Sequence, residues 1–186
     1  MKLIKIILLI FISFNTSFKV ISAEDLKKIL KEDGKLIFIR HAYAPGNGDP
    51  DGFEISNCAS QRNLNKEGIK QSKRIGQFFI KNDIKIGKVL SSEWCRCKQT
   101  AEYAFTNYET KNFLNSFFSQ EFSHNKDRQI NELKMYINKW NGKKNLIFVT
   151  HYVVILEILN LSVSSGEIIV TDRNFNILVR KNTYNN

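Results

Sequence analysis

The sequence predicts an α/β fold: a three-layer α/β/α sandwich with a mostly parallel central sheet. Short apolar runs typical of buried strands alternate along the chain with segments of helical periodicity. Two of these runs, 35–40 and 145–150, end next to a histidine, His41 and His151, although the chain has only three histidines. Ligands of open parallel sheets bind outside the carboxyl ends of the strands, so we expect a functional site at that edge.

The N-terminus has the features of a secretory signal peptide over residues 1–23. Lys2 and Lys5 precede an uncharged apolar stretch at 6–14, and the small residue Ala23 offers a cleavage point. An uncleaved membrane anchor is the main alternative, but polar residues interrupt the stretch well before the roughly 20 apolar residues that a spanning helix needs. The segment therefore predicts a secreted or periplasmic protein without stable membrane insertion after cleavage.

Residues 24–186 have the length of a single domain with a sizeable core. The formal net charge of the whole chain is +10, and cleavage would remove three lysines and no acidic residue. The remaining lysines are scattered rather than aligned along one element, and no nucleic-acid-binding motif is present. We therefore expect a solvated basic surface that attracts phosphorylated molecules, and not a nucleic-acid-binding protein.

The first elements are a helix, a strand and a long connection. Residues 24–33 have an amphipathic pattern that ends at Gly34, which is typical of a helix. The apolar run 35–40 is the first buried strand. The connection 41–63 is rich in Gly, Pro, Asn and Asp, and loops of this length inside a compact domain are usually functional.

The next elements repeat the alternation of helix and strand. Asn65 is a favourable N-cap for a helix over 66–81. A second strand is expected at 88–91, followed by a helix over 95–105. In the region 106–125 apolar and polar residues mix without a period, so no element is predicted there.

The last third of the domain completes the sheet. A helix is expected over 126–140, followed by the strand 145–150 and a helix over 152–160. Two further strands, 167–171 and 175–181, flank a polar turn.

The residues at the strand exits suit phosphoryl transfer through a covalent histidine. Such a reaction needs a neutral imidazole facing the phosphorus and rigid guanidinium donors around the phosphoryl oxygens. His41 fits the nucleophile and Arg40 the first donor. Arg96 falls near the start of a helix that follows a strand, where free N–H groups also favour anions. His151 follows the third strand and offers a further donor to the same phosphate.

Each of these residues alone has a simpler explanation. Arg40 and His41 could form a surface pair, His151 could cap a helix, and Arg96 could extend into solvent. Their common position at three strand exits favours a shared phosphate pocket.

These residues resemble the motifs of a known family. Arg40-His41-Ala42 is similar to the Arg-His-Gly signature of the histidine phosphatase superfamily, which includes cofactor-dependent phosphoglycerate mutases. The stretch 91–101 resembles its second motif, in which Ser-Ser is followed by an arginine and then Gln-Thr-Ala. Thr150-His151 matches the position of its second histidine. The segment 62–68 resembles one found in small bacterial phosphohistidine phosphatases, and together the motifs span residues 36–160.

The resemblance implies a phosphoglycerate mutase-like fold and a role for each matching residue. His41 would become phosphorylated, while Arg40, Arg96 and His151 would bind the phosphate. Arg62 would be a further anion contact. Asn47 matches a phosphate-contacting asparagine of mutase-like members, or else serves as a turn residue of its loop. No metal or cofactor is implied.

The chain also departs from the family pattern at the proton donor. Many members have a glutamate in the region after the second arginine helix, where the corresponding residues 113–116 of this chain offer Asn115 and no acid. The acid-phosphatase branch has an aspartate where this chain has Tyr152. Asp49, Asp51 and Glu93 are alternative acids, although Glu93 is better placed to pair with Arg96 or cap its helix. The proton donor is therefore not assigned.

The three cysteines predict one disulfide. Cys95 and Cys97 lie too close in sequence to favour pairing with each other, so Cys58 is expected to pair with Cys95 or Cys97. Three buried free thiols are the alternative. A zinc site is disfavoured because no fourth ligand lies at a suitable spacing.

Together these features predict an exported phosphohydrolase that acts through a phosphohistidine on His41. Its substrate would be a phosphorylated small molecule or a phosphoprotein. The alternative is a non-catalytic protein of the same fold that binds phosphate or a phosphorylated ligand, which the missing acid at Asn115 would favour. Mutase activity is less favoured, because the region that would complete a mutase cap is short.

Overall fold

The computed structural model describes residues 23–184, with side chains from Lys27 onward. Six strands form one sheet in the order β3-β2-β4-β1-β5-β6. The strands are β1 (Leu36–Arg40), β2 (Ile86–Ser91), β3 (Glu109–Thr110), β4 (Asn145–Thr150), β5 (Ile168–Thr171) and β6 (Ile177–Lys181). The helices are α1 (Ala23–Lys31), α2 (Lys66–Lys81), α3 (Cys95–Phe105), α4 (Gln120–Ser123), α5 (Lys126–Lys139) and α6 (Tyr152–Leu159), with 3₁₀ turns η1 (Cys58–Ser60) and η2 (Asn112–Leu114).

The strands that lead into the motif residues run parallel. β4 pairs in parallel with β1 on one side and with β2 on the other, while β5 and β6 add antiparallel pairs at the far edge. The carboxyl ends of β1, β2 and β4 therefore meet at one edge of the sheet.

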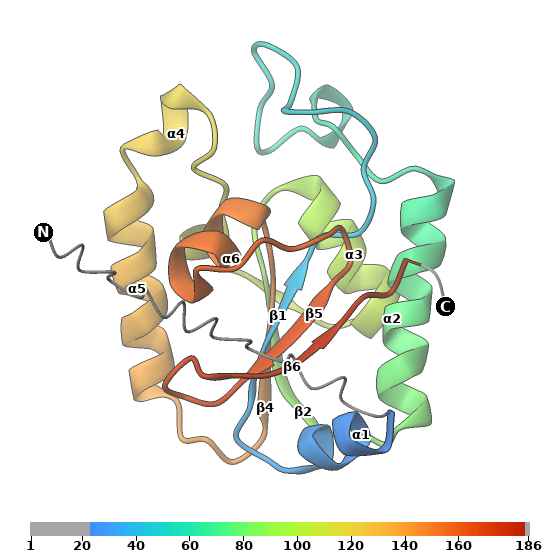
Figure 1. The fold of residues 1–186 in the computed structure, drawn as a ribbon. Helices are drawn as coiled ribbons and strands as arrows, with labels where there is room; N and C mark the ends of the chain where they lie inside the picture. Colours follow the sequence, from blue (N-terminus) through green and yellow to red (C-terminus); the bar gives the residue numbers. More distant parts are fainter. Residues whose placement is uncertain (1–22, 185–186) are drawn as a thin grey trace, which may run out of the picture.

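Helices cover both faces of the sheet (Figure 1), because alternate residues of each central strand point to opposite sides. On one face, Ile37 and Ile39 of β1 pack with apolar side chains of α1, α2 and α3. On the other face, Leu36 and Phe38 pack with α5, α6 and η2. The predicted three-layer α/β/α sandwich with a mostly parallel sheet is confirmed.

The region 106–125 contains short elements that the sequence does not indicate. β3 is two residues long, and both are exposed. α4 is four residues long, and η2 lies between these two elements. Phe113 and Phe117 are buried there against α5 and the sheet. Their burial depends on contacts between distant segments and leaves no period in the local sequence.

The predicted signal segment, apart from Ala23, lies outside the described residues. Among residues 23–184, no helix has the length and apolar character needed to cross a membrane.

Candidate active site

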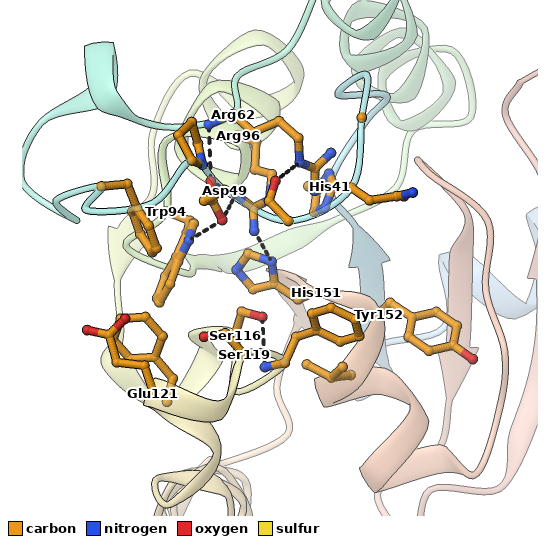
Figure 2. A pocket seen from close by; sticks show the side chains of 18 of the residues that line it. His41, Asp49, Arg62, Trp94, Arg96, Ser116, Ser119, Glu121, His151 and Tyr152 are labelled. Atoms are coloured by element: carbon orange, nitrogen blue, oxygen red, sulfur yellow. Dashed lines mark hydrogen bonds and ion pairs between the residues drawn. The ribbon is translucent and has the colours of Figure 1, made fainter.

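Three strand exits bring Arg96 and the two histidines together (Figure 2). His41 follows β1, His151 follows β4, and Arg96 lies in the first turn of α3 beyond β2. The ring centroids of His41 and His151 are 5.5 Å apart. Backbone pairing continues past the strand ends, with the His41 amide donating to the Thr150 carbonyl at 2.9 Å. The floor of the site is therefore a continuation of the sheet.

The hydrogen bonds of His41 fix its tautomer. Its Nδ1 lies 2.8 Å from the carbonyl oxygen of Ala42, which can only accept, so Nδ1 carries the proton. Nε2 is then the unprotonated nitrogen. Ala42 is itself held in place, because its amide donates to Oγ1 of Thr100 on α3 at 2.9 Å. Burial, and next the charge of Arg96, lower the pKa of His41 well below its usual value, so the ring is neutral at pH 7.

A hydrogen-bond chain fixes the tautomer of His151. Oδ1 of Asn115 accepts from the Glu93 amide at 2.9 Å and from the Ser92 hydroxyl at 3.0 Å. Since the Ser92 hydroxyl donates its only hydrogen to Asn115, its oxygen accepts a hydrogen bond from Nε2 of His151 at 2.8 Å. Nδ1 of His151 is therefore the unprotonated nitrogen, and it lies 3.5 Å from Nη2 of Arg96. Burial, and next the charge of Arg96, lower the pKa of His151 well below its usual value.

Two arginines at the site have buried donors without a partner among the described residues. Arg40 donates from Nη1 to the Val163 carbonyl at 2.8 Å, and its guanidinium lies over the ring of Tyr152. The Nε groups of Arg40 and Arg96 are buried and make no hydrogen bond within the described part of the chain. Both arginines line the pocket, and a guanidinium group is a strong donor to an anion.

Arg62 approaches the same site from the 41–63 connection. Its Nε donates to the Gly48 carbonyl at 2.7 Å and its Nη1 to the Ala44 carbonyl at 2.5 Å. These bonds orient the guanidinium through two of its three nitrogens. Burial, and next the charge of Arg96, lower the pKa of Arg62, but a guanidinium remains protonated in proteins.

The partner of Arg96 is Asp49, not Glu93 as the sequence suggests. Nη1 of Arg96 lies 2.8 Å and 3.0 Å from the two carboxylate oxygens of Asp49, and the two side chains are 4% and 7% exposed. The Trp94 indole also donates to Asp49, at 3.1 Å. The Glu93 carboxylate instead accepts from Nδ2 of Asn115 at 2.6 Å. The sequence indicates Asp49 only as an alternative acid, and no pattern in its irregular loop identifies it as the partner of Arg96.

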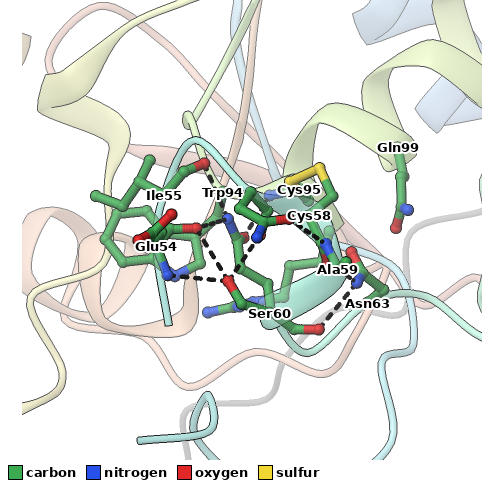
Figure 3. The surroundings of a disulfide bond; sticks show 12 residues. Glu54, Ile55, Cys58, Ala59, Ser60, Asn63, Trp94, Cys95 and Gln99 are labelled. Atoms are coloured by element: carbon green, nitrogen blue, oxygen red, sulfur yellow. Dashed lines mark hydrogen bonds between the residues drawn. A yellow bond between two sulfur atoms is a disulfide. The ribbon is translucent and has the colours of Figure 1, made fainter. Parts of the chain in front are cut away.

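A disulfide joins the 41–63 connection to α3 (Figure 3). It links Cys58 to Cys95, whose Cα atoms are 5.5 Å apart. Beside it, Oε1 of Gln61 accepts from the Cys95 amide at 2.9 Å. The loop that supplies Asp49 and Arg62 is thus attached to the residue next to Arg96. Cys97 is free and buried, and burial raises its pKa to about 12, so it is not a reactive thiol at neutral pH.

These groups surround a pocket with a volume of about 550 Å³. The pocket includes all six residues with a predicted role in phosphate binding: Arg40, His41, Asn47, Arg62, Arg96 and His151. Asn47 is exposed at its rim. Asn115 does not line the pocket, and its side-chain amide forms hydrogen bonds with Ser92 and Glu93. No sequence pattern identifies four aromatic side chains that also line the pocket, which are Phe53, Trp94, Phe118 and Phe122.

Comparisons with known proteins show the fold. Neither a family model nor a curated protein matches the sequence. The structure resembles a protein histidine phosphatase SixA complexed with tungstate, with 15% identity, a TM-score of 0.58, and coverage of 81% of this chain and 98% of that one. It also resembles a phosphoglycerate mutase from Thermus thermophilus (16% identity, TM-score 0.55, coverage 78% and 97%). An alpha-ribazole phosphatase from Shigella flexneri is a third similar structure (15% identity, TM-score 0.56, coverage 74% and 90%). The chain thus has the fold of these solved structures, which is the phosphoglycerate mutase-like fold that the resemblance implies.

Proposed function

We propose that this chain is a histidine phosphatase, a phosphohydrolase that removes phosphoryl groups through a phosphohistidine on His41. The observation that supports this function best is the orientation of His41. Its protonated Nδ1 is held by Ala42, which leaves Nε2 as a neutral nucleophile in a pocket with three arginines. Arg40, Arg62 and Arg96 line this pocket, and guanidinium groups are strong donors to a phosphoryl group.

In the first step, the lone pair of His41 Nε2 attacks phosphorus and the bond from phosphorus to the leaving atom breaks. Guanidinium donors of Arg40, Arg62 and Arg96 stabilise the charge on the phosphoryl oxygens. The low pKa of His41 favours this step, because a protonated imidazole has no lone pair to donate.

In the second step, water attacks phosphorus, the bond between phosphorus and Nε2 breaks, and inorganic phosphate leaves. His41 returns to its neutral tautomer because the Ala42 carbonyl holds the Nδ1 proton throughout. Nδ1 of His151 takes up a proton when a phosphate dianion is present, and then donates a hydrogen bond to it.

The leaving atom must accept a proton unless it departs easily. Asn115 is not an acid and does not reach the pocket, and Asp49 is ion-paired with Arg96. Asp51 and Glu121 are the other carboxyl groups that line the pocket. We therefore propose that aryl phosphates and phosphoramidates, whose leaving groups need little proton donation, are better substrates than alkyl phosphates.

The test compares wild-type protein with His41→Ala in turnover of 4-nitrophenyl phosphate. We expect turnover that the substitution abolishes, and a labelled phosphohistidine on the peptide containing His41 after brief exposure and alkaline work-up. If both proteins show the same background turnover but bind inorganic phosphate, the chain is instead a non-catalytic phosphate-binding protein.

We further propose that residues 1–23 direct export to a secreted or periplasmic location. The support is the basic start, the apolar stretch and Ala23 in the sequence. Expression of the full chain in a bacterial host, followed by N-terminal sequencing, should give a mature protein that begins at Glu24. A chain that keeps its N-terminus would overturn cleavage, and membrane fractionation would then identify an anchor.

A further inference from the structure

We propose that the pocket contains an aromatic subsite beside the phosphate site. It would bind an aromatic ring on the group that carries the phosphate. The substrate would then be a small organic phosphate with one phosphoryl group and an aromatic ring. This inference rests on the proposed function, because the phosphoryl group is taken to lie against His41.

The subsite is lined by the half-buried rings of Phe53 and Phe122, and the ring of Trp94, which is only 1% exposed, packs against both. Their ring centroids are 5.8 Å apart for Phe53 and Trp94, 5.4 Å for Trp94 and Phe122, and 5.9 Å for Phe53 and Phe122. These distances are typical of tilted and edge-to-face aromatic packing. The three rings come from three separate segments of the chain that meet at the pocket.

Trp94 connects this subsite to the phosphate site. Its ring lies 5.4 Å from the ring of His151, at an interplanar angle of 78°. Figure 2 shows Trp94 next to Asp49, with Glu121 further from the phosphate site. A ligand whose phosphoryl group contacts His41 and His151 would therefore place its next atoms near these rings.

Two polar groups beside these rings are already engaged within the protein, so they are not free to bind the hydroxyl groups of a ligand. The Trp94 indole N–H donates to Asp49, and the Tyr152 hydroxyl pairs with Oγ of Ser162 at 3.0 Å. A phosphorylated sugar needs several donors and acceptors for its hydroxyl groups. An aromatic ring needs only apolar contact, which these rings supply.

Phe118 extends the apolar surface to the mouth of the pocket. Its side chain is 72% exposed, whereas the adjacent Phe117 is 8% exposed and belongs to the core. Isolated exposed apolar residues are common on proteins. Phe118, however, lines the same pocket as Phe122, and contiguous exposed apolar surface marks ligand-binding grooves.

Charge and size limit the ligand further. Asp51 and Glu121 line the pocket, and these carboxylates would repel a second phosphoryl group. The volume of about 550 Å³ lies within the range of sites for small molecules. These features favour a small monophosphate over a bisphosphate or a folded phosphoprotein.

The test is the binding of two phosphonates, which the enzyme cannot hydrolyse. Benzylphosphonate and methylphosphonate share the anionic group and differ by one ring. We expect calorimetry to show that benzylphosphonate binds wild-type protein at least tenfold more tightly. In Phe122→Ala and Phe118→Ala this preference should fall to about threefold or less, while the affinity for methylphosphonate stays within twofold.

Ile80→Ala is the matched control, because Ile80 is an exposed apolar residue on α2 and does not line the pocket. This variant should keep the full preference for benzylphosphonate. Equal wild-type affinities for the two phosphonates would overturn the aromatic subsite, as would an equal loss of both ligands in the phenylalanine variants. Turnover that depends on His41 would still support the proposed phosphatase in that case. Loss of that turnover, by contrast, would overturn the proposed function itself.

Discussion

Asp49 and Arg96 form a buried ion pair at the centre of the site, with Nη1 2.8 Å from the nearer carboxylate oxygen. A buried pair is stable when its remaining donors and acceptors are satisfied. Asp49 meets this condition through the Trp94 indole and the Arg62 backbone amide, each at 3.1 Å. The pair fixes one side of the guanidinium and directs Nη2 towards His151. Asp49 is therefore a positioning residue for the arginine that would bind the phosphoryl group.

Replacing Asp49 should separate anion binding from catalysis. In Asp49→Asn the pocket loses one negative charge, so inorganic phosphate should inhibit about fivefold more strongly, which corresponds to about 1 kcal/mol. Because Arg96 loses its ionic partner, kcat should fall by about tenfold or more. Inhibition constants and steady-state kinetics with 4-nitrophenyl phosphate measure both effects. Asp51→Asn is the control, because Asp51 is exposed and forms no ion pair with Arg96; a kcat loss of equal size there would refute the positioning role.

The tautomer of His151 should depend on Ser92. In Ser92→Ala the buried Nε2 proton loses the hydroxyl that accepts it. The neutral ring is then free to adopt the other tautomer, and the doubly protonated ring that would donate from Nδ1 to phosphate becomes less stable. We expect kcat to fall by about 10- to 100-fold with a smaller change in KM. Ser91→Ala is a matched control, since the Ser91 hydroxyl is equally buried but donates to the Ser92 carbonyl. Nitrogen NMR shifts of His151 that match wild type in Ser92→Ala would contradict this explanation.

The sequence indicates the positions of His41, Arg96 and His151 because a physical rule connects them. Parallel strands expose their carboxyl ends at one edge, so residues that follow such strands lie close together whatever their separation along the chain. The continuous apolar runs of β1 and β4 are enough to identify these strands.

Asp49 and the aromatic subsite follow no such rule. Asp49 and Arg96 are 47 residues apart, and Asp49 lies in a loop whose path is fixed by tertiary contacts. Phe122 lies on the four-residue helix α4, which is too short to give a periodic signal. Side chains whose positions depend on irregular segments require the structure itself.

The disulfide should contribute to stability by restricting the unfolded chain. The bridge spans a sequence separation of 37 residues, for which the chain-entropy relation gives about 3–4 kcal/mol. We expect the paired substitution Cys58→Ala with Cys95→Ala to lower the free energy of unfolding in urea by this amount. Dithiothreitol should lower the free energy of unfolding of the wild-type protein by a similar amount. It should leave the free energy of unfolding of the double variant unchanged. Cys97→Ala, which leaves the bridge intact, should keep the response to dithiothreitol; a wild-type protein indifferent to the reductant would contradict the bridge.

The two buried histidines should make stability depend on pH in a defined direction. Their folded pKa values lie well below the unfolded value of about 6.5, so below pH 6.5 the unfolded chain binds protons that the folded protein does not. The free energy of unfolding should therefore be highest above pH 6.5 and decrease as pH falls. The limiting slope is about 1.4 kcal/mol per pH unit for each histidine, and it ends when pH reaches the folded pKa.

Urea unfolding at pH 5, 6, 7 and 8 in a phosphate-free buffer measures this dependence. His41→Asn should remove about half of the decrease between pH 7 and pH 5, because one of the two groups no longer titrates. His124→Asn is the control, since His124 is exposed and should leave the decrease unchanged. If the free energy of unfolding were constant from pH 7 to pH 5, the two imidazoles would not be held neutral by burial. The neutral nucleophile at His41 would then lose its physical basis.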